Sequence, residues 1–312
     1  MSGTTGEATG GAVGGAAAGS GSPGVLETLH GGERPRPVSV DAPVLVNEHV
    51  SDRYWRVRLR APEIAARFAP GQFVMVTVSR GTDRGPVLPR PMAIYDADAG
   101  AGWIELVYSV VGAGTRALTG FRAGEPLCTV GPLGRGFELP PELRERPEHT
   151  AQARGGGVLL LGRGIGTCSL APLTALLAPS PEHTAVTSGR HPGALIGREL
   201  YERRGVRCLP VHDADGSAAP SALARTLHEL HDARPPALIA VCGARRLETL
   251  ALELAGRWGS EVQVALEAHM ACGLGYCHGC STGTRDAAAE APLICRDGPV
   301  FGLRPHTLPA AA

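Results

Sequence analysis

Four cysteines near the C-terminus have the residue type and spacing to bind iron. The segment ACGLGYCHGC carries three of them in the pattern C-x4-C-x2-C, and a fourth follows after a gap. This is the plant-type ligand pattern of a [2Fe–2S] cluster. The candidate ligands are Cys272, Cys277, Cys280 and Cys295. A cluster of this kind carries single electrons, so the pattern predicts a redox protein.

Two other kinds of cysteine site stay open. Structural zinc sites usually have two C-x2-C-like pairs, whereas only Cys277 and Cys280 form such a pair here. Disulfides need an oxidising compartment, and residues 1–24 lack the charged and apolar regions of a secretory signal. The spacing favours the cluster over both. The remaining cysteines, in apolar surroundings, are expected to be buried: Cys128, Cys168, Cys208 and Cys242.

A glycine-rich turn could bind phosphate. Gly162, Gly164 and Gly166 follow the apolar run 158–161 and precede an expected helix. Such glycines let a pyrophosphate sit on backbone amides at a helix N-terminus. The spacing G-x-G-x-G differs from the Rossmann fingerprint, so a tightly packed turn is an equal alternative. No acid for a ribose follows the next expected strand. Arg190 there could meet the 2′-phosphate of NADP or lie flat against adenine, so the choice between NAD and NADP stays open.

The elements around these motifs predict a multidomain β plus α/β fold. Residues 37–140 alternate with period two between Gly and Pro clusters, which is typical of an antiparallel barrel or sandwich. Residues 157–266 alternate strand and helix, which predicts a parallel sheet with helices on both faces. Helices are expected over 169–177, 195–201, 221–231 and 246–258, with Ser221 as a cap. Residues 267–305 form a small glycine-rich cluster module, and residues 1–36 are expected to be a disordered tail.

The bulk composition excludes some classes of protein. The chain has 30 basic and 30 acidic residues, so no basic surface for nucleic acid is indicated. Its apolar runs are too short to cross a bilayer. A cytoplasmic protein without nucleic-acid or membrane partners is therefore expected.

The order of barrel, α/β unit and cluster is that of a flavin reductase. From about residue 43 to 301 the chain resembles the electron-transfer subunits of type B dihydroorotate dehydrogenase, in the ferredoxin–NADP reductase superfamily. Residues 90–95 look like the family's R-P-x-S flavin motif, and residues 112–115 match its G-x-G-T turn. Residues 131–137 match a G-P-L-G-x-G-F loop, and residues 266–273 match the L-E-x-x-M-x-C-G run before the cluster.

The resemblance implies cofactors and residue roles. FAD would be bound by Arg90, Pro91, Met92, Ala93, Val107, Tyr108, Ser109, Gly114 and Thr115. Ala93 stands where the family usually has Ser, which removes a hydroxyl near the flavin N5 atom. NAD(P)H would donate electrons at the Gly162–Gly166 turn, and no general acid or base is needed.

The resemblance also implies a partner. Electrons would continue from FAD through the cluster to the FMN of a dihydroorotate dehydrogenase catalytic subunit, in pyrimidine biosynthesis. The expected assembly is a heterotetramer with two of each subunit. The alternatives are a related NAD(P)H-dependent flavin and iron–sulfur reductase with another redox partner, and a zinc-stabilised nucleotide-binding module.

Overall fold

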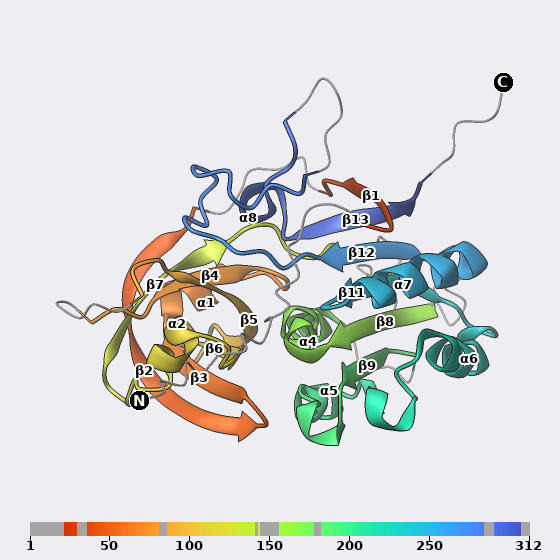
Figure 1. The fold of residues 1–312 in the computed structure, drawn as a ribbon, viewed down its shortest axis with the longest axis horizontal. Coiled ribbons are helices and arrows are strands. Elements are labelled where there is room, and N and C mark those ends of the chain that lie inside the picture. The colour runs from red at the N-terminus through yellow and green to blue at the C-terminus, as the bar shows by residue number, and fades with distance from the viewer. Residues whose placement is uncertain are drawn as a thin grey trace, which may run out of the picture.

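The N-terminal part of the chain forms a closed antiparallel barrel. The computed structural model describes residues 22–29, 36–80, 86–140, 143, 156–177, 182–283 and 290–306. In barrel order the strands are β2 (Val38–Ser51), β3 (Tyr54–Arg60), β6 (Trp103–Ser109), β5 (Arg90–Asp98), β4 (Phe73–Thr77) and β7 (Pro126–Leu133). Two short helices, α1 (Pro62–Ala65) and α2 (Ala113–Leu118), lie in its connections (Figure 1). The predicted antiparallel barrel is confirmed.

Alternation along the strands explains why the barrel closes. In β3, Val57 and Leu59 are fully buried, and the intervening Arg58 pairs with Glu105 on the neighbouring strand at 2.7 Å. Successive strand side chains point to opposite faces, so each strand contributes one apolar row to the interior. The barrel is therefore filled by side chains.

The second part of the chain is a sheet of seven strands in the order β1-β13-β12-β11-β8-β9-β10. Its parallel strands are β8 (Gly156–Arg163), β9 (Thr184–Gly189), β10 (Arg207–His212), β11 (Pro236–Cys242) and β12 (Glu261–Ala265). The central strands are almost continuously apolar because both faces of the sheet are covered. The predicted parallel sheet is confirmed.

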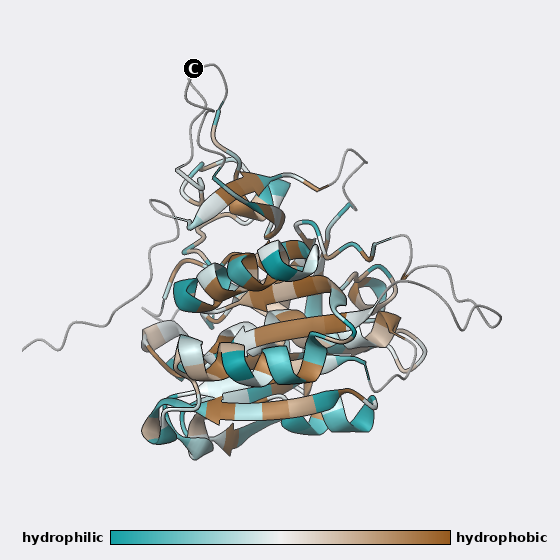
Figure 2. Cartoon of the chain, turned by 90° about the vertical axis from the view of Figure 1, so that its right-hand side faces the viewer, coloured by the Kyte–Doolittle hydropathy of each residue, from teal (hydrophilic) through white to brown (hydrophobic). Residues whose placement is uncertain are grey.

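Helices cover both faces of this sheet. α4 (Thr167–Leu170), the 3₁₀ turn η2 (Ala171–Leu176) and α5 (Arg198–Arg203) pack on one face. α6 (Pro220–His231) and α7 (Arg245–Trp258) pack on the other. Figure 2 shows the apolar strands between helices whose polar residues face outward. The shorter elements are η1 (Gly164–Gly166), η3 (Pro192–Ala194), η4 (Asp213–Asp215) and α8 (Ile294–Asp297).

Two details of the expected helices are wrong. The helix expected over 169–177 is α4 followed by η2, where Pro172 supplies no backbone N–H to continue the α-helical ladder. α6 starts at Pro220, with Ala219 as the N-cap residue and no capping side chain, so Ser221 is not a cap. Proline suits the first helical turn because its missing N–H has no partner there.

The two ends of the described chain meet at one edge of the sheet. β1 (Gly24–Glu27) pairs antiparallel with β13 (Val300–Pro305), which pairs with β12. Leu26 packs on the core, and Glu27 pairs with Arg304 at 2.7 Å. The expectation of a disordered tail through residue 36 is therefore wrong for β1, while residues 1–21 and 30–35 lie outside the described residues. β13 likewise extends the α/β sheet rather than belonging to the cluster loop alone.

The parallel strands point their carboxyl ends at the barrel (Figure 1). In an open α/β sheet, ligands bind outside these ends.

No helix among the described residues is long and apolar enough to cross a membrane. The division of the chain into domains at residues 36, 140, 157, 266 and 305 stays a prediction.

Candidate functional site: two joined cavities and a cysteine loop

A cavity of about 290 Å³ opens beside barrel strands β4, β5 and β6. The residues expected to bind flavin line it: Arg90, Pro91, Met92, Ala93, Val107, Tyr108, Ser109 and Thr115. Phe73, Ile165 and Met270 complete its largely apolar wall. An apolar slot with a few polar groups is the usual form of a cofactor site. The structure therefore gathers these residues, and their binding of FAD remains a prediction.

Arg90 is suited to hold an anion at one end of this cavity. Within the described part of the chain it forms no ion pair, and its hydrogen bond to the carbonyl of Pro89 is long, at 3.4 Å. Gly114 does not line the cavity but lies against Arg90, where a Cβ atom would overlap the guanidinium group. The arginine fork matches phosphate geometry. Gly114 thus has a steric role, and Arg90 fits a pyrophosphate.

Two polar side chains of the cavity wall already have partners. The Thr115 hydroxyl accepts hydrogen bonds from the amides of Val111 and Gly112, at 3.0 and 3.2 Å, and so fixes the turn before α2. The Tyr108 hydroxyl donates to Asn47 at 3.0 Å. Both residues therefore shape the cavity through these bonds.

A second cavity of about 920 Å³ lies between the barrel and the carboxyl ends of the parallel strands. Arg53 and Tyr54 line it from the barrel. Arg163, Gly189, Arg190, His191 and Gly243 line it from the sheet. This is the position and size expected for a dinucleotide site.

The three glycines of the candidate phosphate turn have different roles. Gly164 lines the second cavity and has a positive φ of 53°. Gly162 and Gly166 do not line it: a Cβ on Gly162 would lie 2.7 Å from Thr167, and one on Gly166 would lie 2.6 Å from Gly243. These two glycines allow close packing of the turn, so only Gly164 is placed to meet a phosphate.

The two cavities meet at one wall. The residues that line both are Pro91, Ser109, Val111, Ile165, Glu267, Ala268 and His269. The Glu267 side chain is accessible from the cavities but otherwise surrounded by protein, and this burial raises the pKa of its carboxyl group. Glu267 therefore lies on the wall where ligands in the two cavities would come closest to each other.

The four candidate cluster cysteines lie in two pairs. The Sγ atoms of Cys272 and Cys277 are 3.4 Å apart, and the amide of Cys295 donates to the Sγ atom of Cys280 at 3.4 Å. Cys280 and Cys295 are buried, whereas Cys277 is exposed. A [2Fe–2S] cluster takes two protein ligands on each iron. Each pair supplies the two thiols that one iron needs, while no three candidate ligands of the described residues gather at a single point.

Hydrogen bonds around the loop lower the pKa values of Cys272 and Cys280, the latter to about 6, whereas the hydrogen bond with Cys280 and burial raise the pKa of Cys295. Burial raises the pKa of Cys272, but hydrogen bonds from Leu274, Cys277 and Tyr276 outweigh it, and the pKa falls to about 7. Thiolates are the form of cysteine that binds metal. The same loop touches the barrel, since a Cβ on Gly273 would overlap Met75 of β4. The cysteine loop and the first cavity thus share β4, whose Phe73 lines that cavity.

Several residues of this site were missed in the sequence. Arg163 ends β8, Asp213 follows β10 and Glu267 follows β12 shortly after its end. Polar residues at the carboxyl ends of parallel strands gather at one edge, and that rule was the available signal. His269 and Arg53 had none, because only the packing of barrel against sheet brings them to the second cavity.

Comparison with known proteins agrees with this geometry. Residues 267–304 match the family model of the iron–sulfur cluster binding domain of dihydroorotate dehydrogenase B. An electron transfer subunit of dihydroorotate dehydrogenase B (NAD(+)) from Bacillus velezensis is 28% identical over 255 residues, which cover 82% of this chain and 93% of the relative. That of Geobacillus thermodenitrificans is 29% identical over 261 residues, covering 83% and 94%. The chain is a homologue of these electron transfer subunits.

Solved structures of other proteins share the fold of this chain, which is a homologue of the electron transfer subunits. An NADH-dependent reduced ferredoxin–NADP oxidoreductase, described for flavin-based electron bifurcation, aligns with a TM-score of 0.66 and 22% identity, covering 88% of this chain and 90% of the other. The ferredoxin–NADP⁺ reductase of Plasmodium falciparum aligns with a TM-score of 0.51 and 9% identity, covering 74% and 93%. The homologue therefore has the ferredoxin reductase fold, followed by an iron–sulfur binding segment.

Proposed function

We propose that the chain is the electron transfer subunit of a dihydroorotate dehydrogenase B. In this role it takes electrons from NADH at FAD and passes them through a [2Fe–2S] cluster to the FMN of a catalytic subunit, as part of pyrimidine biosynthesis. One observation carries the proposal. Residues 266–270 line the first cavity, and residues 267–269 also line the second. Cys272, the first candidate cluster ligand, follows two positions after Met270, so one segment joins all three sites.

The residues of the two cavities have separate tasks. Arg90 binds a pyrophosphate, and the walls from β5 and β6 hold a flat ring in the first cavity. Gly164 meets the phosphates of the dinucleotide in the second cavity. The wall that the two cavities share, which includes Pro91 and His269, orients the two ligands against each other and excludes water between them. Positioning of this kind accounts for most of what the protein contributes in a cofactor enzyme.

The bound groups supply the electron chemistry: FAD accepts a hydride and releases electrons singly, and the cluster carries one electron at a time. The chain holds them near each other through β4. Phe73 lines the first cavity, while Met75 on the same strand touches the cysteine loop at Gly273. The route between the two sites is thus built from packed side chains rather than from solvent.

The cysteine loop also supplies a surface for the partner. Tyr276 is 84% exposed and Leu274 is 40% exposed, both beside Cys277. Exposed aromatic and aliphatic residues are enriched in protein interfaces. A catalytic subunit seated on this loop would place its FMN next to the exposed ligand. We propose a heterotetramer of two subunits of each kind, whose mass would be measured by light scattering on the co-purified complex.

The visible spectrum of the anaerobically purified chain tests the function. Flavin and iron–sulfur bands that are both bleached by NADH are expected. Adding the catalytic subunit and orotate should then restore the oxidised spectrum as dihydroorotate forms. Reoxidation only by ferredoxin or another carrier would reassign the chain to a related reductase. A colourless chain with bound zinc would overturn the electron-transfer role.

A further inference from the structure

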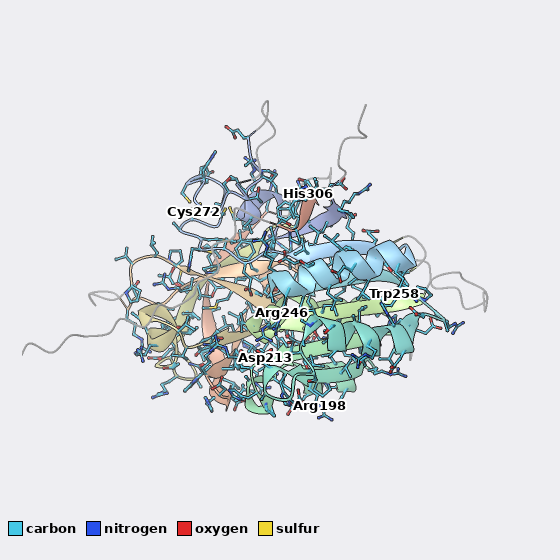
Figure 3. All side chains as sticks on the ribbon, turned by 45° about the vertical axis from the view of Figure 1, so that its right-hand side comes forward. Arg198, Asp213, Arg246, Trp258, Cys272 and His306 are labelled. Carbon is cyan, nitrogen blue, oxygen red and sulfur yellow. The ribbon has the colours of Figure 1, made fainter. Side chains whose placement is uncertain are left out.

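A carboxylate and two arginines form a cluster at the rim of the larger cavity. Arg163, the last residue of β8, donates through Nη2 to Oδ2 of Asp213 at 2.5 Å. Arg246, in the first turn of α7, donates through Nη2 to the other carboxylate oxygen at 2.6 Å. Asp213 thus holds two arginines that come from distant parts of the sequence. Figure 3 shows Asp213 and Arg246 together at the end of the sheet nearer the barrel, far from Trp258.

This cluster adjoins the end of β9, where a doubly wound sheet binds the ribose of the adenosine. Arg163 also donates through Nη1 to the Ser188 hydroxyl at 2.9 Å and to the Gly189 carbonyl at 3.3 Å. The amide of Ala214 donates to the Arg190 carbonyl at 3.1 Å. Dinucleotide sites usually have an acid at this strand end for NAD, or an arginine for the 2′-phosphate of NADP. The end of β9 itself offers only Arg190, so the acid at this edge comes from the next strand.

Asp213 accepts hydrogen bonds from the two guanidinium groups that a phosphate would need. Both oxygens of its carboxylate are engaged, and the hydrogen bonds from Arg163 and Arg246 lower the pKa of the group. The carboxylate therefore stays charged at neutral pH. A phosphate monoester carries about −1.5 to −2 charges there. A 2′-phosphate would meet this negative charge and would have to displace it from both arginines.

We propose that Asp213 sets the choice of electron donor, favouring NADH over its 2′-phosphorylated form by clamping Arg163 and Arg246. The proposal rests on the function proposed above, since it concerns the donor site of the same reaction. Asp213 does not line the cavity but acts through Arg163, which does. It is thus a specificity residue that works through its neighbours, and removing its charge frees Arg163, which lines the cavity, and Arg246 beside it for the 2′-phosphate.

The test compares Asp213→Asn with Asp215→Asn. Asp215 is a matched control because it lies in the same 3₁₀ turn and is exposed, and it bonds Ser217 rather than either arginine. Binding of 2′,5′-ADP and 5′-AMP to each variant is measured by calorimetry. Flavin reduction by NADH and NADPH is measured by stopped flow. These pairs of ligands differ only by the 2′-phosphate.

In Asp213→Asn, the preference for NADH over NADPH and for 5′-AMP over 2′,5′-ADP is expected to fall by about tenfold or more, as expected for a charge removed at close range. Asp215→Asn should keep the preference of the parent chain. The double variant Asp213→Asn, Arg246→Met should lose most of the gain, because it removes one of the freed forks. An unchanged preference in Asp213→Asn, or a gain that persists fully in the double variant, would overturn the proposal.

Failure of the wider function would look different. If the chain binds 5′-AMP and responds to Asp213→Asn but transfers no electrons, the donor-site inference stands and the electron-transfer role falls. If NADH reduces the flavin in all variants and each variant prefers NADH over NADPH to the same degree, the electron-transfer role stands. Asp213 then does not determine the preference. The binding measurements need no bound flavin or cluster, so they separate the two cases.

Discussion

The four candidate cluster ligands differ in how deeply they are buried. Cys280 and Cys295 are buried in the core shared with the sheet, while Cys277 is exposed at the tip of the loop. Loss of the exposed sulfur therefore disturbs the protein core least. It still leaves one iron with a single protein ligand, which does not hold a cluster of this type.

Cys277→Ser should therefore lose the cluster and keep the flavin. Iron is expected to fall from about two atoms per chain to near zero, with FAD content and unfolding temperature close to those of the parent. Iron assay and the visible spectrum check this. Cys128→Ser, on β7 of the barrel, is the control and should retain both iron atoms. Loss of FAD together with iron would mean that the two sites do not form independently.

A histidine between α6 and α7 makes stability depend on pH. His231 is 5% exposed and lies edge-on to Trp258, with ring centres 5.9 Å apart. Burial, with a smaller contribution from Arg207, lowers its pKa below the usual value. The unfolded chain therefore binds the proton more readily, and stability rises with pH in this range. The contribution is complete above about pH 6.5 and is lost as the pH falls below it.

His231→Leu should reduce the loss of stability between pH 7.5 and pH 5. Urea unfolding of both proteins at the two pH values measures this change. His228→Gln, one turn earlier on α6, serves as the control and should keep the full loss. Equal pH dependence in the parent and in His231→Leu would show that another group carries the effect.

At the scale of elements, local patterns predicted most of the fold. The region 37–140, where residues alternate with period two, contains β3 and β6, and the apolar run at 158–161 is the centre of β8. β1 was missed because four residues carry too little periodicity, and its pairing with β13 depends on the far end of the chain. The iron–sulfur segment was predictable because three of its candidate ligands are neighbours in sequence, and it matches a known family model. The Arg163–Asp213–Arg246 cluster was not, because its members come from β8, the turn after β10, and α7.

The strand β1 gives a prediction at this scale. Removing residues 1–29 deletes β1 and exposes the edge of β13, so a lower unfolding temperature and faster loss of iron are expected. Removing residues 1–21 leaves β1 in place and should change neither. Thermal unfolding and timed iron release compare the two truncations. Equal behaviour of both would contradict a stabilising role for β1.

At the scale of the whole molecule, ion pairs fix the barrel against the sheet. Asp96, at the end of β5, is 9% exposed and accepts a hydrogen bond from Arg204, which follows α5, at 2.5 Å. Arg204 also donates to the Thr174 hydroxyl at 3.0 Å. The second cavity lies between these same two parts, so we expect loss of this contact to disturb the position of a ligand there.

Arg204→Met should weaken this junction. Stability is expected to fall by about 1 kcal/mol or more, because a short charged hydrogen bond to a buried carboxylate is lost, while Asp96 keeps Arg203 at 3.5 Å and the Ala97 amide at 3.0 Å. Flavin reduction by NADH should slow while FAD content stays unchanged. Arg198→Met, at the start of α5, breaks only an exposed pair with Glu202 and should change stability far less. Urea unfolding and stopped-flow reduction are the measurements, and equal effects of the two substitutions would contradict the role of Arg204.

The pairing of β1 with β13 has a consequence for folding during synthesis. On the ribosome, β1 is made long before its partner β13, because the whole barrel and the parallel strands are synthesised between them. Contacts between distant parts of a chain form slowly, and unpaired edges meanwhile invite association with other chains. Cys295 is also made late, just before β13. Closure of the sheet edge and completion of the candidate iron site therefore both wait for the segment from Cys295 to β13.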